Sequence, residues 1–421
     1  MRRISLLFLW AVCVIWVSAQ KAQNEYRWGM AYLKSGQLAD AVKSLDKAAQ
    51  KGNTDAQVQL GVLYHQGRGV AQDDVEAARL YRQAASQHNA EGAFLLAEML
   101  RMGVGEEKNL SEALSYYIQA AEGGNIKAQQ ELAGLYYKGT EVPPNRAEAA
   151  KWYSRLAERG DSAALFMLGG MSEFGDGIAQ DSARAFAYYE RAAKAGHAEG
   201  QLSLAYCYLK GMGTPSDEAK ARVWYEKATS NGLAEAAYHL SKLCSEKKER
   251  LRWLVVAADS GFAQAQNDLG TRYAQGDGVA QNYNTAFSWY RKAAEQRLSE
   301  AQFNLAVAYE EGAGTVADKA KALEFFSRAA VQGYAPAEYA LGRLYATGEA
   351  GEQNWQKAAT WFELSAKHGV PEAQYNIGLL YYRGVGVRQN LREARSWLEL
   401  AAKSDSPVRR SAESFLRHNL N

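Results

Sequence analysis

The chain has 421 residues, with 49 Lys and Arg against 47 Asp and Glu. Without Arg2 and Arg3, which precede the first apolar run, the basic and acidic residues are equal in number. No basic stripe stands out, which argues against nucleic acid and against a polybasic membrane patch as partners.

The first residues predict a secretory signal peptide, 1–19. Arg2 and Arg3 precede an apolar run from Ile4 to Val17, and Ala19 ends a small-residue cleavage site. The run is shorter than the roughly 20 residues that a membrane span needs. We therefore expect export to a periplasm or out of the cell, or to the endoplasmic reticulum lumen in a eukaryote. An uncleaved anchor and a lipoprotein attached at Cys13 are the alternatives. No later segment is apolar enough to span a bilayer.

A block of 36 residues recurs from near the start of the chain to near its end, marked by a small residue after Leu or Ile. The small residues are Gly61, Ala97, Ala133, Gly169, Ala205 and Ser241 and, after one shortened unit, Gly270, Ala306, Gly342 and Gly378. A fixed period in this range is typical of a solenoid, in which each unit buries its apolar face against its neighbours. Solenoids offer long surfaces and few pockets, so we expect binding rather than catalysis.

Within one unit, residues 53–88, two helical patterns flank a glycine-rich turn. Glycine costs about 1 kcal/mol in a helix interior, so close approach of the second helix is the expected reason for Gly61. Gly67 is expected to end the first helix, and Asp73 to cap the second. Asp73 and Glu76 together predict a capping box. The equivalent N-caps are Asn109, Asn145, Asp181, Asp217, Asn282, Asp318, Asn354 and Asn390.

The repeated pattern A-x-x-x-L-G-x-x-Y-x-x-G-x-G-V, then Asp or Asn, then A-x-x-W-Y-x-K-A-A, resembles the Sel1-like repeat, a relative of the tetratricopeptide repeat. The unit from Phe262 to Arg297 is close to a consensus copy, and the resemblance extends from Glu25 to Ser404. It implies an all-α, right-handed α-solenoid of about eleven αα-hairpin repeats. It also implies an adaptor or scaffold in protein complexes. Some cysteine-rich relatives have been called β-lactamases.

The predicted organisation follows the repeats. A tetratricopeptide-like repeat without the G-x-G turn occupies residues 20–52. Sel1-like repeats fill residues 53–261, and their last unit, 233–261, has lost its turn and N-cap. Further Sel1-like repeats fill 262–404, and residues 405–421 are expected to form a C-terminal capping helix. We expect the shortened unit to be a weak joint.

Catalytic chemistry finds no support in the residue pattern. The histidines fall in different units without ligand spacing: His65, His88, His197, His239, His368 and His418. The G-x-G turns follow helices rather than strands and lack the ending of a phosphate loop. We therefore expect no enzyme, no catalytic residue, no metal site and no cofactor.

Two cysteines remain after signal removal, Cys207 and Cys244, on the first helices of adjacent units. Export favours a disulfide between them. Packed helices lie about 8–10 Å apart, however, while a disulfide needs Cα atoms within about 7 Å. The sequence does not decide between a disulfide and a pair of small buried thiols.

The candidate partner-binding residues are aromatic side chains on the first helices. They occupy the positions three residues before and one or four residues after the small residue. These positions lie on a face of the helix away from the core stripe. In tetratricopeptide-like solenoids that face lines the concave groove. Aromatic residues are enriched at binding hot spots. We call this set the first-helix stripe: Phe94, Tyr137, Phe166, Tyr206, Tyr238, Phe303, Tyr339, Tyr375 and Tyr382. The alternative is that these rings pack on the next repeat.

The sequence thus favours an exported, non-enzymatic adaptor or scaffold that binds a protein or peptide partner along its groove. A second hypothesis is a structural scaffold of an envelope polysaccharide-export or secretion complex, which would use convex or terminal surfaces. A β-lactamase-like hydrolase, as claimed for cysteine-rich relatives, is a remote third.

Overall fold

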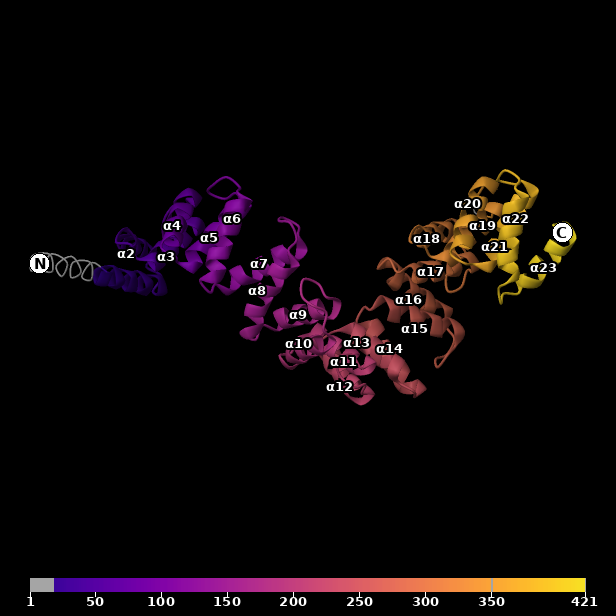
Figure 1. Ribbon diagram of the computed structural model, residues 1–421, viewed down its shortest axis with the longest axis horizontal. Helices are drawn as coiled ribbons and strands as arrows, with labels where there is room; N and C mark the ends of the chain where they lie inside the picture. Colours follow the sequence, from indigo (N-terminus) through magenta and orange to yellow (C-terminus); the bar gives the residue numbers. More distant parts are fainter. Residues whose placement is uncertain (1–18, 350, 421) are drawn as a thin grey trace, which may run out of the picture. The chain divides into compact units, whose positions relative to one another are not determined.

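The computed structural model describes residues 19–349 and 351–420, and the regular secondary structure of these ranges is entirely helical. Of the signal peptide predicted for residues 1–19, residues 1–18 lie outside the described residues. Within residues 19–221 and within residues 222–420, successive helices pack as hairpins and successive hairpins pack on one another (Figure 1). The prediction of an all-α solenoid is confirmed.

The helices alternate between a first and a second position in each repeat. Residues 19–34 are helical and pair with α2 (Leu38–Gln50) in the first repeat. The later first helices are α3 (Thr54–Gln66), α5 (Ala90–Met102), α7 (Ile126–Lys138), α9 (Ser162–Phe174), α11 (Ala198–Lys210), α13 (Ala234–Leu243), α15 (Ala263–Gln275), α17 (Ser299–Glu311), α19 (Ala335–Thr347) and α21 (Pro371–Arg383). The second helices are α4 (Asp74–Ser86), α6 (Leu110–Glu122), α8 (Arg146–Glu158), α10 (Ser182–Lys194), α12 (Glu218–Ser230), α14 (Lys247–Asp259), α16 (Tyr283–Glu295), α18 (Lys319–Val331), α20 (Trp355–Lys367) and α22 (Leu391–Ala402).

Where the small residue of the first helix is glycine, it sits against a large side chain of the second helix. A methyl group on Gly61 would lie 2.5 Å from Cε1 of Tyr81, and one on Gly342 would lie 2.5 Å from Cδ1 of Phe362. Because these distances are too short for any real contact, the ring can pack only on a bare glycine backbone. The close approach expected from the sequence is confirmed.

The predicted helix ends are also present. The first helix α3 ends at Gly67, whose φ of 63° is in the left-handed region. Each predicted N-cap of a second helix accepts a hydrogen bond from the third helical residue, as Asp73 does from the amide of Glu76 at 2.9 Å. The capping box is wrong, however. The Glu76 carboxylate binds Arg79 instead, and the amide of Asp73 already donates to the Tyr64 carbonyl at 3.0 Å.

The chain divides into two compact units, Met1–Ala221 and Arg222–Asn421, and the boundary falls within α12. We call them the N-terminal and the C-terminal unit. Both bury the leucine before the small residue completely, as Leu132 and Leu341 illustrate at 0% exposure. Each unit is therefore built on the same repeated core.

The shortened repeat in the C-terminal unit lacks the usual caps. Its first helix α13 has ten residues, and it ends at Cys244 in an extended conformation instead of at a left-handed glycine. Its second helix α14 begins after Glu246, which makes no side-chain cap hydrogen bond. Arg250 partly replaces these contacts, because its guanidinium donates to the Cys244 carbonyl at 2.9 and 3.0 Å.

The C-terminal helix α23 (Val408–Asn419) covers the last repeat. Ala412 is fully buried against the cluster that contains Leu398 of α22. Phe415 packs edge-on against Tyr382 of α21, with ring centroids 5.0 Å apart. The apolar face of the final hairpin is thereby removed from water, as the end of a repeat array requires.

Candidate functional site

The first-helix stripe is only partly accessible. Tyr206 is the exposed member, with 43% of its surface free, and it has Lys210 6.0 Å above its ring. Phe94 is buried at 8% exposure and packs on Tyr117. The other seven stripe residues are half-buried. Most rings of the stripe therefore expose only part of their surface.

Several stripe rings pack on the residue that precedes the next first helix, which is the alternative left open by the sequence. The rings of Phe166 and His197 stack, and the other two pairs meet at a tilt. The centroid distances are 4.9 Å for Phe166 and His197, 5.1 Å for Tyr238 and Phe262, and 5.5 Å for Phe303 and Tyr334. These contacts hold the three stripe rings against the following repeat, where each ring is half-buried.

The remaining stripe residues are anchored within or next to their own repeat. The guanidinium of Arg146 lies 3.9 Å from the ring centroid of Tyr137. Tyr339 meets Phe362 at 5.8 Å, and Tyr375 lies against the C-terminal cluster around Leu398. In neither unit do the stripe residues gather into one site.

The two cysteines are free thiols in the structure, and both are buried. Burial, with a smaller contribution from Glu173, raises the pKa of the Cys207 thiol to about 12. Burial also raises the pKa of the Cys244 thiol, whose sulfur lies 3.4 Å from the Arg222 guanidinium. Such thiols are unreactive at neutral pH, which is typical of structural rather than catalytic cysteines.

A ladder of buried glutamines joins adjacent repeats, and the sequence analysis missed it. Four residues before the small residue, Gln302 donates to the Ala294 carbonyl of the preceding repeat at 3.4 Å and accepts from Gln332 at 2.7 Å. Glutamine occupies this position in six repeats, so the spacing alone could have revealed the ladder. The equivalent glutamines are Gln57, Gln129, Gln201, Gln266 and Gln374.

One repeat breaks the ladder with a carboxylate. Glu338 is completely buried, and its Oε2 lies 2.8 Å from Nδ1 of His368. Its other oxygen, Oε1, has no hydrogen-bond partner among the described residues. A glutamate and a histidine here replace the glutamine pair formed by Gln302 and Gln332 one repeat earlier.

Two further properties of the described ranges bear on function. Residues 19–349 and 351–420 contain no group of three or more His, Cys, Asp or Glu side chains placed to hold a metal ion. No helix in the same ranges is both long and apolar enough to cross a membrane.

Comparison with known proteins identifies the repeat. The Sel1 repeat family matches residues 54–89, 90–125, 126–161, 162–197, 198–233, 263–298, 299–334, 335–370 and 371–406. The gap between the fifth and sixth segments is the shortened repeat.

Two solved structures share the fold over most of the chain. A protective antigen present in uropathogenic Escherichia coli strains, with an SLR fold, is 30% identical; the match covers 93% of this chain and 88% of that chain with a TM-score of 0.66. A Sel1 repeat protein from Oxalobacter formigenes is also 30% identical, over 80% of this chain and 90% of that chain, with a TM-score of 0.50.

A curated protein is similar over a short stretch. The exopolysaccharide production negative regulator of Rhizobium leguminosarum bv. viciae is 38% identical over 58 residues. Those residues are 14% of this chain and 22% of the regulator, so the match spans about a fifth of that protein.

Proposed function

Because the chain belongs to the Sel1 repeat family, whose members are typically protein-interaction scaffolds, we propose that it is an exported adaptor or scaffold without catalytic activity. Its partner is a protein or peptide that lies along the first-helix stripe. The buried, weakly acidic thiols and the dispersed histidines fit a binding role better than a catalytic one.

The exposed ring of Tyr206 carries this proposal. An aromatic side chain with 43% exposure in the middle of a regular first helix offers a large contact area. Its neighbours on the stripe are already held by ring contacts. This chain would therefore lose little side-chain conformational entropy when a partner binds.

The test compares two tyrosines of similar exposure on the two kinds of helix. Tyr206 lies on first helix α11 with 43% exposure, and Tyr283 begins second helix α16 with 47% exposure. The partner is first identified by affinity purification of the tagged protein from its native envelope. Tyr206→Ser should then weaken binding of the purified partner by roughly 30-fold, since a hot-spot aromatic contributes about 2 kcal/mol. Tyr283→Ser should leave it unchanged. Equal binding by both variants would contradict the use of the stripe.

Export is proposed from the sequence of the first residues, where Arg2 and Arg3 precede the apolar run and Ala19 ends the cleavage site. N-terminal sequencing of protein recovered outside the cytoplasm should find a chain that begins just after Ala19. An intact Met1 on exported protein would contradict the proposed cleavage.

A second candidate is a scaffold of an envelope polysaccharide-export or secretion complex that uses convex or terminal surfaces. The local likeness to a regulator of exopolysaccharide production favours it. In a deletion strain with altered exopolysaccharide output, Tyr206→Ser should restore normal output if this candidate is correct. It should fail to do so if the stripe binds the partner.

A further inference from the structure

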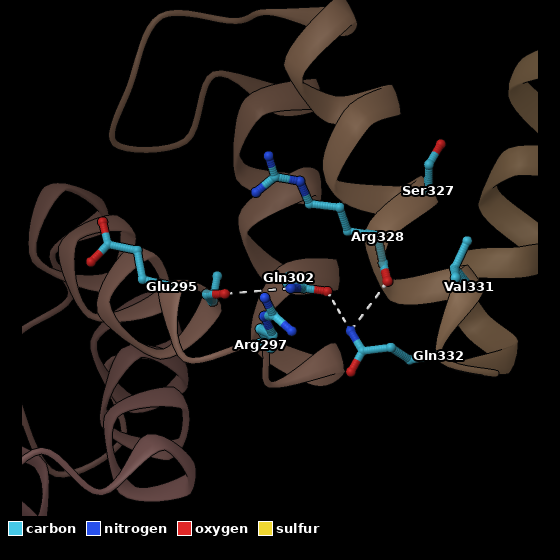
Figure 2. Close-up of a pocket in the computed structure, with 8 residues that line it drawn as sticks. Glu295, Arg297, Gln302, Ser327, Arg328, Val331 and Gln332 are labelled. Atoms are coloured by element: carbon cyan, nitrogen blue, oxygen red, sulfur yellow. Dashed lines mark hydrogen bonds between the residues drawn. The ribbon is translucent and has the colours of Figure 1, made fainter. Parts of the chain in front are cut away.

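An open hollow of about 630 Å³ lies between the ends of α16 and α18 and the start of α17, in the C-terminal unit. Figure 2 shows its floor, where Gln302 joins the Ala294 carbonyl at 3.4 Å and Gln332 at 2.7 Å. Because these bonds belong to the glutamine ladder, the floor is held rigidly by three successive helices. Glu295, Arg297, Arg328 and Val331 are among the residues that line it.

Arg297 at the edge of this hollow departs from the rule of the repeat. It occupies the turn after the second helix with φ of 65°, in the left-handed region that L side chains avoid. His88, with φ of 62°, is the one other non-glycine residue with positive φ in the part of the chain that is described. Outside the last repeat, which has Asp405 here, this turn position is otherwise glycine: Gly52, Gly124, Gly160, Gly196, Gly232, Gly261, Gly333 and Gly369. An arginine kept in an unfavourable conformation points to a function for its side chain.

Val331 on the opposite side departs from the rule as well. It is the last residue of α18 and is 80% exposed. The last residue of the other thirteen-residue second helices of the Sel1-like repeats is polar or charged: Ser86, Glu122, Glu158, Lys194, Ser230, Asp259, Glu295 and Lys367. Two exceptions to the repeat, from neighbouring hairpins, therefore meet at one hollow (Figure 2).

The charges around the hollow leave one cation without a partner. Arg328 pairs with Glu324 at 2.5 Å, and Glu295 lies 4.0 Å from Arg291. The guanidinium of Arg297 makes no hydrogen bond or ion pair within residues 19–349 and 351–420. A free guanidinium next to an exposed valine is complementary to a carboxylate beside an apolar side chain.

We propose that this hollow docks a segment of a partner protein in which an acidic residue is followed by an apolar one. The carboxylate binds Arg297, and the apolar side chain packs on Val331, next to which Arg328 of the same helix α18 is a second cation. Arg297 and Val331 lie in the turn after second helix α16 and at the end of second helix α18, and no member of the first-helix stripe lines the hollow. Its test is therefore independent of the function proposed above.

The repeat itself supplies the variants for the test. Arg297→Gly and Val331→Ser restore residues that other repeats have at these positions, so both variants should fold normally. His88→Gly makes the same glycine replacement at the other strained turn, where Glu122 stands in the place of Val331. The probes are two fluorescein-labelled peptides, SGDLVDLGS and its lysine counterpart SGKLVKLGS, titrated by fluorescence anisotropy against the full chain. Circular dichroism checks the helical content of each variant.

The unaltered chain and His88→Gly should bind the acidic peptide saturably and with equal affinity, and neither should bind the lysine peptide. Arg297→Gly should weaken binding by about tenfold, the effect of one charge-assisted hydrogen bond, and Val331→Ser by at least about threefold. Absence of saturable binding overturns the proposal. So does equal binding of the lysine peptide, or an affinity that Arg297→Gly leaves unchanged.

Discussion

The two units join their repeats in different ways, although their cores are the same. In the N-terminal unit every first helix from α3 to α11 begins after a polar residue whose side chain accepts a backbone N–H: Asn53, Asn89, Asn125, Asp161 and His197. In the C-terminal unit the same position is apolar and makes no cap hydrogen bond: Leu233, Phe262, Leu298, Tyr334 and Val370. The change coincides with the boundary between the units.

Both kinds of residue, polar and apolar, link a repeat to the one before it. Asn125 caps α7 and also donates its side-chain amide to Glu91 at 2.7 Å. Tyr334 gives up the cap but packs on Phe303 of the preceding repeat, with centroids 5.5 Å apart. A cap contributes about 1 kcal/mol, and an aromatic pair about 0.5–1.5 kcal/mol beyond its buried area. The same repeat backbone thus accepts a polar or an apolar residue before the first helix at similar stability. We call these two arrangements the polar joint and the apolar joint.

The largest expected effect tests whether the repeated cores of the two units are equally important for stability. Leu132→Ala in the N-terminal unit and Leu341→Ala in the C-terminal unit each remove a fully buried side chain. Each should lower the free energy of unfolding of its own unit by about 2–5 kcal/mol through a cavity. Urea denaturation, followed by hydrogen exchange resolved along the sequence, measures both losses. A loss confined to one of the two variants would show that the cores differ.

A smaller effect is expected at the apolar joint. Tyr334→Ala should cost about 2 kcal/mol, roughly half the loss for a fully buried aromatic residue, since Tyr334 is half-buried. Tyr334→Asn should cost about 1 kcal/mol less than Tyr334→Ala, because asparagine restores the N-cap of α19. Hydrogen exchange in α17 to α19 reports both variants. Equal exchange in the two would mean that the cap cannot form in the C-terminal unit.

The polar joint should respond to a different substitution. Asn125→Ala removes the cap of α7 and its bond to Glu91, and should cost about 1 kcal/mol. Asn125→Gly should cost only a few tenths of a kcal/mol, since glycine is tolerated at this position. Thermal unfolding of the two variants gives the comparison. Equal losses in the two variants would show that the bond to Glu91, which both variants lack, outweighs the cap.

The sequence predicts the features that recur in every repeat, but not the features that differ between repeats. The small residues, the glycine turns and the N-caps of the second helices recur often enough to be recognised. The N-caps of the first helices were missed, because Asn125 and Tyr334 share a position but not a chemistry. Exposure of the first-helix stripe could not be predicted, since it depends on rings such as His197 and Tyr334 in the following repeat.

Glu338 offers a test of the glutamine ladder, which both units contain. Its Oε1 is buried without a partner in the described part of the chain, whereas Gln302 donates from the same position to a carbonyl eight residues back. Glu338→Gln should therefore stabilise the C-terminal unit by about 0.5–1 kcal/mol, even though it loses the contact with His368. The reverse change, Gln302→Glu, should destabilise it. Urea midpoints of both variants decide, and a loss of stability in Glu338→Gln would show that the pair with His368 is worth more than the ladder bond.

The last prediction concerns a reaction rate rather than stability, and it uses the two cysteines as internal probes of the units. Both thiols are buried, and burial raises the pKa of each, so alkylation at pH 8 requires local opening. Cys207 lies in α11, which ends at a left-handed glycine, while Cys244 ends the uncapped α13 of the shortened repeat.

Iodoacetamide should therefore modify Cys244 about tenfold faster than Cys207, which corresponds to about 1.4 kcal/mol less free energy for opening. Peptide mass spectrometry over a time course measures both rates. Arg250→Lys should increase the difference, because a lysine cannot make both bonds from the guanidinium to the Cys244 carbonyl. Equal rates would show that the shortened repeat is no weaker than its neighbours. Modification of both cysteines only after reduction would instead establish a disulfide.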